Sequence, residues 1–214
     1  MKARILLACS VFAAIAFRVL CASAVTVVTF DDLPEDGSGS FISSPYQGLN
    51  WNFVSCNNAI LFTNIIPHEI HSVTNGLTGN YYGMVSDSNV AVITSGTQIT
   101  STGANFDFLS ANLTAFWNNN LNIEVQGFNG TNLLFDTTVI ASATNATLFA
   151  FNYVDVSGVL FTSSGGTPIF GNDYSNFVMD NFSFEFIPEP STILLCGLGP
   201  ILLCPAFKRK RAKE

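Results

Sequence analysis

Hydrophobic and polar residues alternate most clearly in the middle and near the end of the chain. Across residues 121–126 every second residue is aliphatic and the residues between are polar, and residues 182–186 alternate phenylalanine with polar residues. Successive side chains of a strand point to opposite faces of a sheet, so this period of two predicts half-buried β-strands.

Further short hydrophobic runs, separated by Gly, Pro, Asn, Asp and Ser, predict the other strands. They cover residues 25–30, 47–54, 59–66, 81–86, 90–94, 104–117, 133–140, 147–153 and 158–162, with a hairpin turn over 127–132. No segment combines a 3.6-residue hydrophobic period with helix-capping residues. The pattern predicts one all-β domain over residues 25–186, an antiparallel β-sandwich of jelly-roll type.

An apolar segment with basic residues before it precedes this domain. Residues 5–17 form the apolar run, and Ala22-Ser23-Ala24 follows as a small-x-small site. The run has the length of a signal-peptide core and is too short to span a bilayer. We therefore predict a signal helix in a signal peptide over residues 1–24, which signal peptidase cuts after Ala24. A lipoprotein signal through Cys21 and an uncleaved N-terminal anchor remain as alternatives.

The C-terminal segment has three features in order. Pro188-Glu189-Pro190 precedes an apolar stretch over residues 193–207, and a basic cluster that includes Arg209 and Arg211 ends it. The pattern predicts a single transmembrane helix with its basic end in the cytoplasm and the domain outside. From residue 191 to residue 207 a straight helix reaches only about 26 Å, less than a hydrocarbon core of about 30 Å. Its Gly and Pro residues also make it a poor permanent anchor.

The same three features resemble the PEP-CTERM sorting signal of Gram-negative bacteria that make exopolysaccharide. The resemblance implies that residues 187–214 are a sorting tail, which an exosortase cuts near Pro188-Glu189-Pro190. It also implies an inner-membrane intermediate, with the C-terminus in the cytoplasm, before the protein reaches the cell surface or the medium. A permanently single-pass, membrane-anchored surface protein is the alternative.

Three short motifs of the domain carry a second resemblance. Thr29-Phe30-Asp31-Asp32-Leu33, Tyr46-Gln47-Gly48-Leu49-Asn50-Trp51 and Phe177-Val178-Met179-Asp180-Asn181-Phe182 resemble ectodomains that often precede such tails. Those ectodomains are similar to galactose-binding-like and carbohydrate-binding jelly rolls. Such jelly rolls often hold a structural calcium ion where the first and last strands meet, which implies Asp32 and Asp180 as ligands. Clustered carboxylates suit calcium, and a solvated acidic loop is the alternative.

The charge of the domain limits its partners. No Lys or Arg occurs between Val19 and Phe207, whereas all but one of the 15 Asp and Glu residues lie there. This excess of negative charge disfavours nucleic acid and anionic lipid as partners. It permits a divalent cation or a neutral glycan such as an exopolysaccharide.

The residues with catalytic potential are few. His68 and His71 are three apart, whereas a helical zinc-protease motif needs a spacing of four. The sequence contains no Gly-x-Ser-x-Gly motif of a serine hydrolase. Cys56 is the one cysteine of the domain and is interpreted as a structural thiol rather than a nucleophile. We therefore expect a protein that is not an enzyme; a secreted hydrolase that attacks polysaccharide with two carboxylates is the alternative.

Aromatic side chains are the candidates for binding sugar. Trp51 is in phase with neighbouring apolar residues and is predicted to be core, whereas Trp117 stands at a strand end before three asparagines. Trp117, Tyr81 and Tyr82 are therefore the predicted glycan-binding residues, with core packing as the alternative. The sequence as a whole predicts a non-catalytic, exported surface or matrix protein.

Overall fold

The structure, a computed structural model, describes residues 23–33, 42, 44–53, 79–86, 89–171 and 173–188 of the 214-residue chain. Ala24 and Pro188 lie in described segments without regular secondary structure. Several residues that the sequence singled out lie outside the described residues: Ala22, Glu189, Pro190, Arg209, Arg211, His68, His71 and Cys56, together with the predicted strand over 59–66. No helix among the described residues is both long and apolar enough to cross a membrane.

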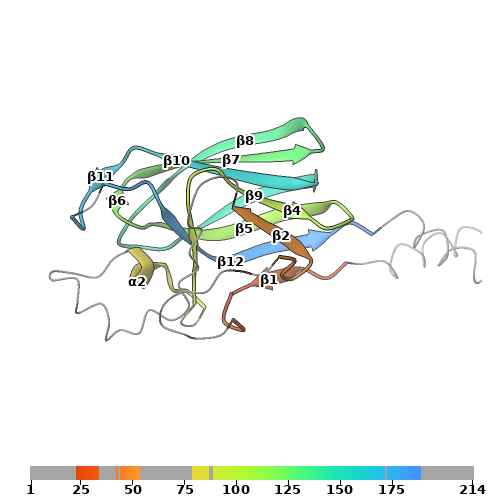
Figure 1. The fold of residues 1–214 in the computed structure, drawn as a ribbon, viewed down its shortest axis with the longest axis horizontal. Helices are drawn as coiled ribbons and strands as arrows, with labels where there is room; N and C mark the ends of the chain where they lie inside the picture. The colour runs from red at the N-terminus through yellow and green to blue at the C-terminus, as the bar shows by residue number, and fades with distance from the viewer. Residues whose placement is uncertain are drawn as a thin grey trace, which may run out of the picture. The chain divides into compact units, whose positions relative to one another are not determined.

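Residues Val25–Phe186 form one compact unit built on two antiparallel sheets of five strands each (Figure 1). The first sheet has the order β1-β12-β5-β9, and β3 also pairs with β12; the strands are β1 Thr26–Val28, β12 Phe177–Phe186, β5 Phe106–Ala115, β9 Thr147–Val156 and β3 Ala91–Ile93. The second has the order β2-β4-β10-β7-β8; its strands are β2 Leu49–Phe53, β4 Thr97–Ser101, β10 Gly158–Ser164, β7 Leu121–Asn129 and β8 Asn132–Ala141. The predicted all-β sandwich is confirmed.

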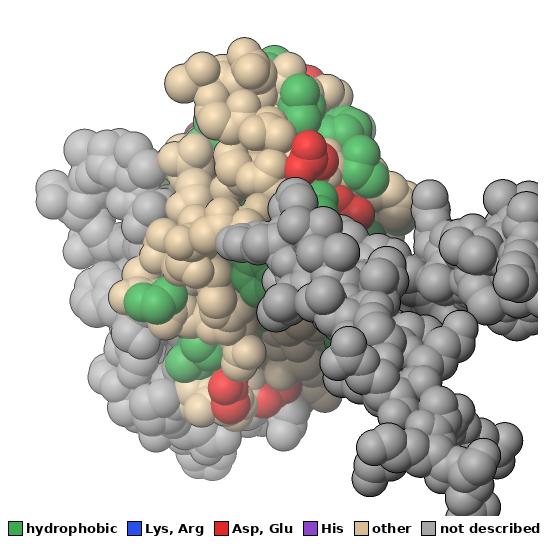
Figure 2. All heavy atoms as spheres, turned by 90° about the vertical axis from the view of Figure 1, so that its right-hand side faces the viewer, with side chains coloured by type: hydrophobic (Ala, Val, Ile, Leu, Met, Phe, Trp, Pro, Cys, Tyr) green, Lys and Arg blue, Asp and Glu red, His purple; other side chains and the backbone are tan. Residues whose placement is uncertain are grey.

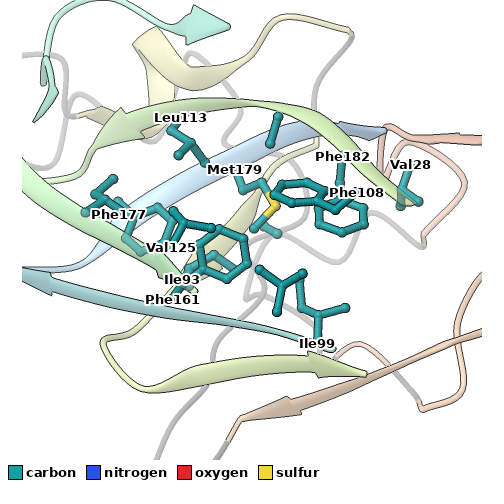
Figure 3. Close-up of a cluster of buried hydrophobic side chains, with 14 of the residues drawn as sticks. Val28, Ile93, Ile99, Phe108, Leu113, Val125, Phe161, Phe177, Met179 and Phe182 are labelled. Atoms are coloured by element: carbon teal, nitrogen blue, oxygen red, sulfur yellow. The ribbon is translucent and has the colours of Figure 1, made fainter. Parts of the chain in front are cut away.

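The core lies between the two sheets, and its largest buried side chains are aromatic. Phe108 of β5 stacks on Phe151 and on Phe182, with ring centroids 4.8 and 4.7 Å apart. Figure 3 shows Phe108 and Phe182 gathered with Phe161 and Val125, which come from the opposite sheet. In β7 the alternating residues Leu121, Ile123 and Val125 are fully buried, as their period of two predicts. Burial of each such side chain stabilises the fold by about 1.5–3 kcal/mol relative to exposure.

One predicted strand is wrong. Residues 81–86 were expected to be extended, but Gly79–Gly83 forms a short helix, α2, and the residues after it are irregular. A Cβ atom at Gly79 would lie 1.8 Å from the backbone oxygen of Ala115, and one at Gly83 would lie 2.3 Å from a methyl group of Val178. The two glycines therefore let α2 lie directly on β5 and β12, a tertiary contact that the local sequence does not show.

The sequence pattern did not predict three of the strands. β4 contains a single apolar residue, Ile99, so its alternation is too short to register as a strand. The two-residue strands β6 (Asn118–Asn119) and β11 (Thr167–Pro168), which pair with each other, carry no hydrophobic period. The turn is also shorter than the predicted range of 127–132, because β7 continues through Gly127 to Asn129. At Gly127 a Cβ atom would lie 2.8 Å from the Tyr153 ring.

Candidate functional site

The three short motifs of the domain meet in one aromatic cluster around Trp51. The indole ring contacts those of Phe30 and Phe182, with centroids 5.4 and 5.5 Å apart, and its Nε1 donates a 3.0 Å hydrogen bond to the carbonyl oxygen of Tyr46. Phe30, Trp51 and Phe182 are 2% exposed or less. The prediction that Trp51 is core is confirmed, and packing is sufficient to explain why these motifs carry aromatic residues.

Asp32 lies at the surface of that cluster. Its carboxylate accepts a short hydrogen bond from the Tyr46 hydroxyl and a 3.3 Å hydrogen bond from Nε2 of Gln47. Burial, and then the Asp32 carboxylate itself, raise the pKa of Tyr46 well above its usual value, so the phenol stays protonated and keeps donating. Asp32 therefore connects the segment after β1 to the one before β2.

Asp180 is fully buried in β12, and four groups donate to its carboxylate. These are the amides of Val85, Ser86 and Asn181, at 2.7–2.9 Å, and the Ser86 hydroxyl at 3.0 Å. Burial raises the pKa of this carboxyl group, while the backbone amides oppose that rise. The carboxylate thus fixes the chain that follows α2 onto β12.

The predicted calcium ligands are held by protein donors. β1 and β12 do pair, as expected for the first and last strands, with Val28 opposite Phe182. Both oxygens of Asp180 accept N–H or O–H groups, whose positive ends face the carboxylate where a cation would have to approach. Among the described residues no group of three or more His, Cys, Asp or Glu side chains could hold a metal ion. The arrangement fits a hydrogen-bonded carboxylate better than a calcium ligand, and the calcium site stays a prediction.

The predicted sugar-binding residues lie around α2 and the segment that follows β5. We call residues 79–83 and 116–119 the α2 end; α2, β6 and β11 lie together in Figure 1. The amide of Gly79 donates a 3.0 Å hydrogen bond to the carbonyl oxygen of Phe116, so α2 and the segment that carries Trp117 are in direct contact.

Three aromatic rings of the α2 end, those of Tyr81, Tyr82 and Trp117, are half-buried. Tyr81 and Tyr82 meet edge to face, with centroids 5.6 Å apart. Trp117 contacts Phe116, with centroids 4.5 Å apart, and packs against a small cluster with Val90, Val92 and Val178. Each ring is thus held by the fold while part of it remains accessible to solvent.

Asn118, beside Trp117, is a polar residue that the sequence analysis did not select. Its side chain is 2% exposed, and its Nδ2 donates to the carbonyl oxygen of Gly165 at 3.0 Å and to the carboxylate of Asp173 at 2.8 Å. Its Oδ1 is buried without a hydrogen-bond partner among the described residues. A buried unpaired acceptor is uncommon and suits a water or ligand hydroxyl. The run of three asparagines after Trp117 was the available signal.

The charged side chains of the described residues are all acidic. Figure 2 shows red acidic side chains and green hydrophobic ones on the coloured surface, and no blue. The described ranges contain no Lys or Arg. The α2 end contains half-buried aromatic rings and no charged side chain, which suits a neutral polyol.

Comparisons with known proteins give little. No protein-family model and no curated protein matches the chain. The chain is similar to the solved structure of a DUF4465 family protein from Bacteroides ovatus ATCC 8483, at 10% sequence identity and a TM-score of 0.37, over 77% of this chain and 95% of that one. That similarity is too distant to carry an inference about function.

Proposed function

We propose that this chain is an exported, non-catalytic surface or matrix protein that is processed at its C-terminus and binds exopolysaccharide through its β-sandwich. The export part rests on the sequence: the signal segment, Pro188-Glu189-Pro190, the apolar stretch and the basic end. The intact mass of the protein recovered from its own host tests it. Loss of residues 1–24 and of Lys208 onward is expected, and recovery of peptides that contain Arg209 contradicts removal of the tail.

The sandwich is further proposed to be a jelly roll. In support, the sheet orders β1-β12-β5-β9 and β4-β10-β7-β8 give four strands to each layer, and the chain changes layer repeatedly. β1, β5, β9 and β12 belong to one sheet, whereas β4, β7, β8 and β10 belong to the other, an interleaving typical of a double Greek key. β2 and β3 are then additions at one margin.

The α2 end is the proposed glycan site. The observation that carries it is the presence of three half-buried rings, those of Tyr81, Tyr82 and Trp117, on a backbone fixed by hydrogen bonds. A flat aromatic face covers the apolar C–H surface of a sugar ring. Since α2 is already held against β5 by the Gly79–Phe116 hydrogen bond, little conformational entropy is lost on binding.

Replacement of Trp117 tests this site. We expect Trp117→Ala to weaken retention of the full-length chain on the host's own exopolysaccharide in affinity electrophoresis by about fivefold or more, if a sugar ring stacks on the indole as strongly as a nucleic-acid base does, which is worth about 1–3 kcal/mol. Val154→Ala, which truncates an exposed side chain of β9, is the matched control and should bind like the wild type. Unchanged retention of a Trp117→Ala protein that still melts cooperatively would remove the α2 end from consideration.

A further inference from the structure

The sandwich has one open side, where two long strands end their sheets. β8 is the last strand of one sheet and β9 the last of the other, and each is ten residues long. The two strands also contact each other across the layers. In Figure 1 β7 flanks β8 on one side only. Among the described residues, each strand therefore presents one unpaired row of backbone donors and acceptors along this side.

Apolar side chains accompany these backbone groups. Leu133, Leu134 and Ile140 of β8 are 49%, 47% and 60% exposed. On β9, Leu148 and Val154 are similarly exposed. Phe135 and Val139 of β8 are half-buried and pack against the edge of the core. Proteins usually protect such edges with Lys, Pro or very short strands. Neither β8 nor β9 contains any of these.

The charge pattern of β8 selects one way of closing this edge. Asp136 is its sole charged residue. When two identical strands pair antiparallel and join two sheets into one layer, the two-fold axis is perpendicular to the sheet, so each side chain stays on its own face. Residues directly opposite each other share a face, and the axis therefore passes between one residue and its own copy. An axis at Asp136 would set two carboxylates opposite each other, and an axis at Phe135 or Thr138 would set Asp136 opposite the partner's Leu134 or the partner's Ile140.

An axis at Thr137 avoids these conflicts. It sets Asp136 opposite the partner's Thr138, and Phe135 opposite the partner's Val139. At the margin, next to the irregularity between Gly127 and Phe128 of the β7 pairing, Leu134 falls opposite the partner's Ile140. Cross-strand pairs of apolar residues stabilise a sheet, and like charges in opposition destabilise it. The strand is thus self-complementary in this register.

We propose that β8 pairs with β8 of a second copy of this chain, antiparallel and centred on Thr137, to form a two-fold dimer with a continuous ten-stranded sheet. A second copy fits better than a charged partner because the edge carries one acid on each strand near its apolar residues, and no cation. The pairing adds one edge strand from each copy, so we expect a weak dimer that dissociates on dilution. This inference is independent of the proposed glycan site.

Reversal of charge at Thr138 tests the register. Thr138 is exposed. In the dimer, Thr138 of each copy lies opposite the partner's Asp136, so the interface contains this pair two times. Thr138→Lys should lower the dissociation constant, measured by sedimentation velocity of the full-length chain, by about three- to tenfold, and Thr138→Glu should raise it by a similar factor. Ser164→Lys and Ser164→Glu make the same change of net charge at an exposed position of β10, away from the open side, and should have smaller effects.

Thermal melting of each variant confirms that the monomer is folded, and Thr138→Lys keeps the test informative if Thr138→Glu is destabilised. A monomer at every concentration overturns the proposal. So do equal shifts at positions 138 and 164, a dimer that ignores both positions, or open-ended oligomers in place of a dimer.

Discussion

At the scale of single residues, the buried carboxylate of Asp180 holds the chain after α2 onto β12. It is 0% exposed and accepts from Val85, Ser86 and Asn181. Asp180→Ala leaves these amides without their acceptor and opens a small cavity. We expect the free energy of unfolding to fall by about 2–4 kcal/mol in urea denaturation. Asp136→Ala, on the exposed edge, should change it by less than about 0.5 kcal/mol. Equal effects of the two variants would show that the Asp180 hydrogen bonds contribute nothing.

The raised pKa of Asp180 gives a pH dependence with a definite sign. Between its unfolded-state pKa near 4 and its higher folded-state pKa, the native state holds a proton that the unfolded state has lost. The free energy of unfolding therefore decreases as pH rises through that window and is flat above it. The difference between wild type and Asp180→Ala should shrink over the same window, when both are measured in parallel. A difference that grows with pH would mean that the amides outweigh burial and lower the pKa.

At the scale of elements, α2 depends on the absence of a side chain at Gly79. Because a Cβ atom would lie 1.8 Å from the Ala115 oxygen, Gly79→Ala must push α2 away from β5. We expect a loss of about 1–3 kcal/mol in stability and weaker retention on exopolysaccharide, since Tyr81 and Tyr82 move with the helix. Gly103→Ala is the matched control, because nothing lies within 4 Å of its Cβ position. Normal stability and binding of Gly79→Ala would show that α2 is not packed as described.

The same element shows where sequence patterns fail. The strands with sustained alternation, such as β7, were predictable because their period of two reports burial directly. α2 was not, because the glycines that create it act through Ala115 and Val178, which are distant in sequence. β4 has one buried apolar residue, and its place in the sheet comes from pairing with β2 and β10.

At the scale of the whole molecule, the periodicity of apolar residues predicted the architecture better than the site. The sandwich and the burial of Trp51 followed from spacing. The neighbourhood of Trp117 did not: Asn118 and Asp173 are 55 residues apart and meet only because the chain returns past β6 before β12. Asp180 was expected to be a calcium ligand where the first and last strands meet, yet its hydrogen-bond partners in the chain after α2 are 94 and 95 residues away. Sequence spacing alone contains no information on such contacts.

The most direct test of the account is to incubate the full-length wild-type protein with its host's exopolysaccharide and to follow binding and reducing ends in the same sample. A non-catalytic glycan-binding protein should migrate more slowly in a gel that contains the polymer, while the number of reducing ends stays constant over many hours. Release of reducing sugars that disappears when one acidic residue is replaced, or migration that the polymer leaves unchanged, would contradict the account.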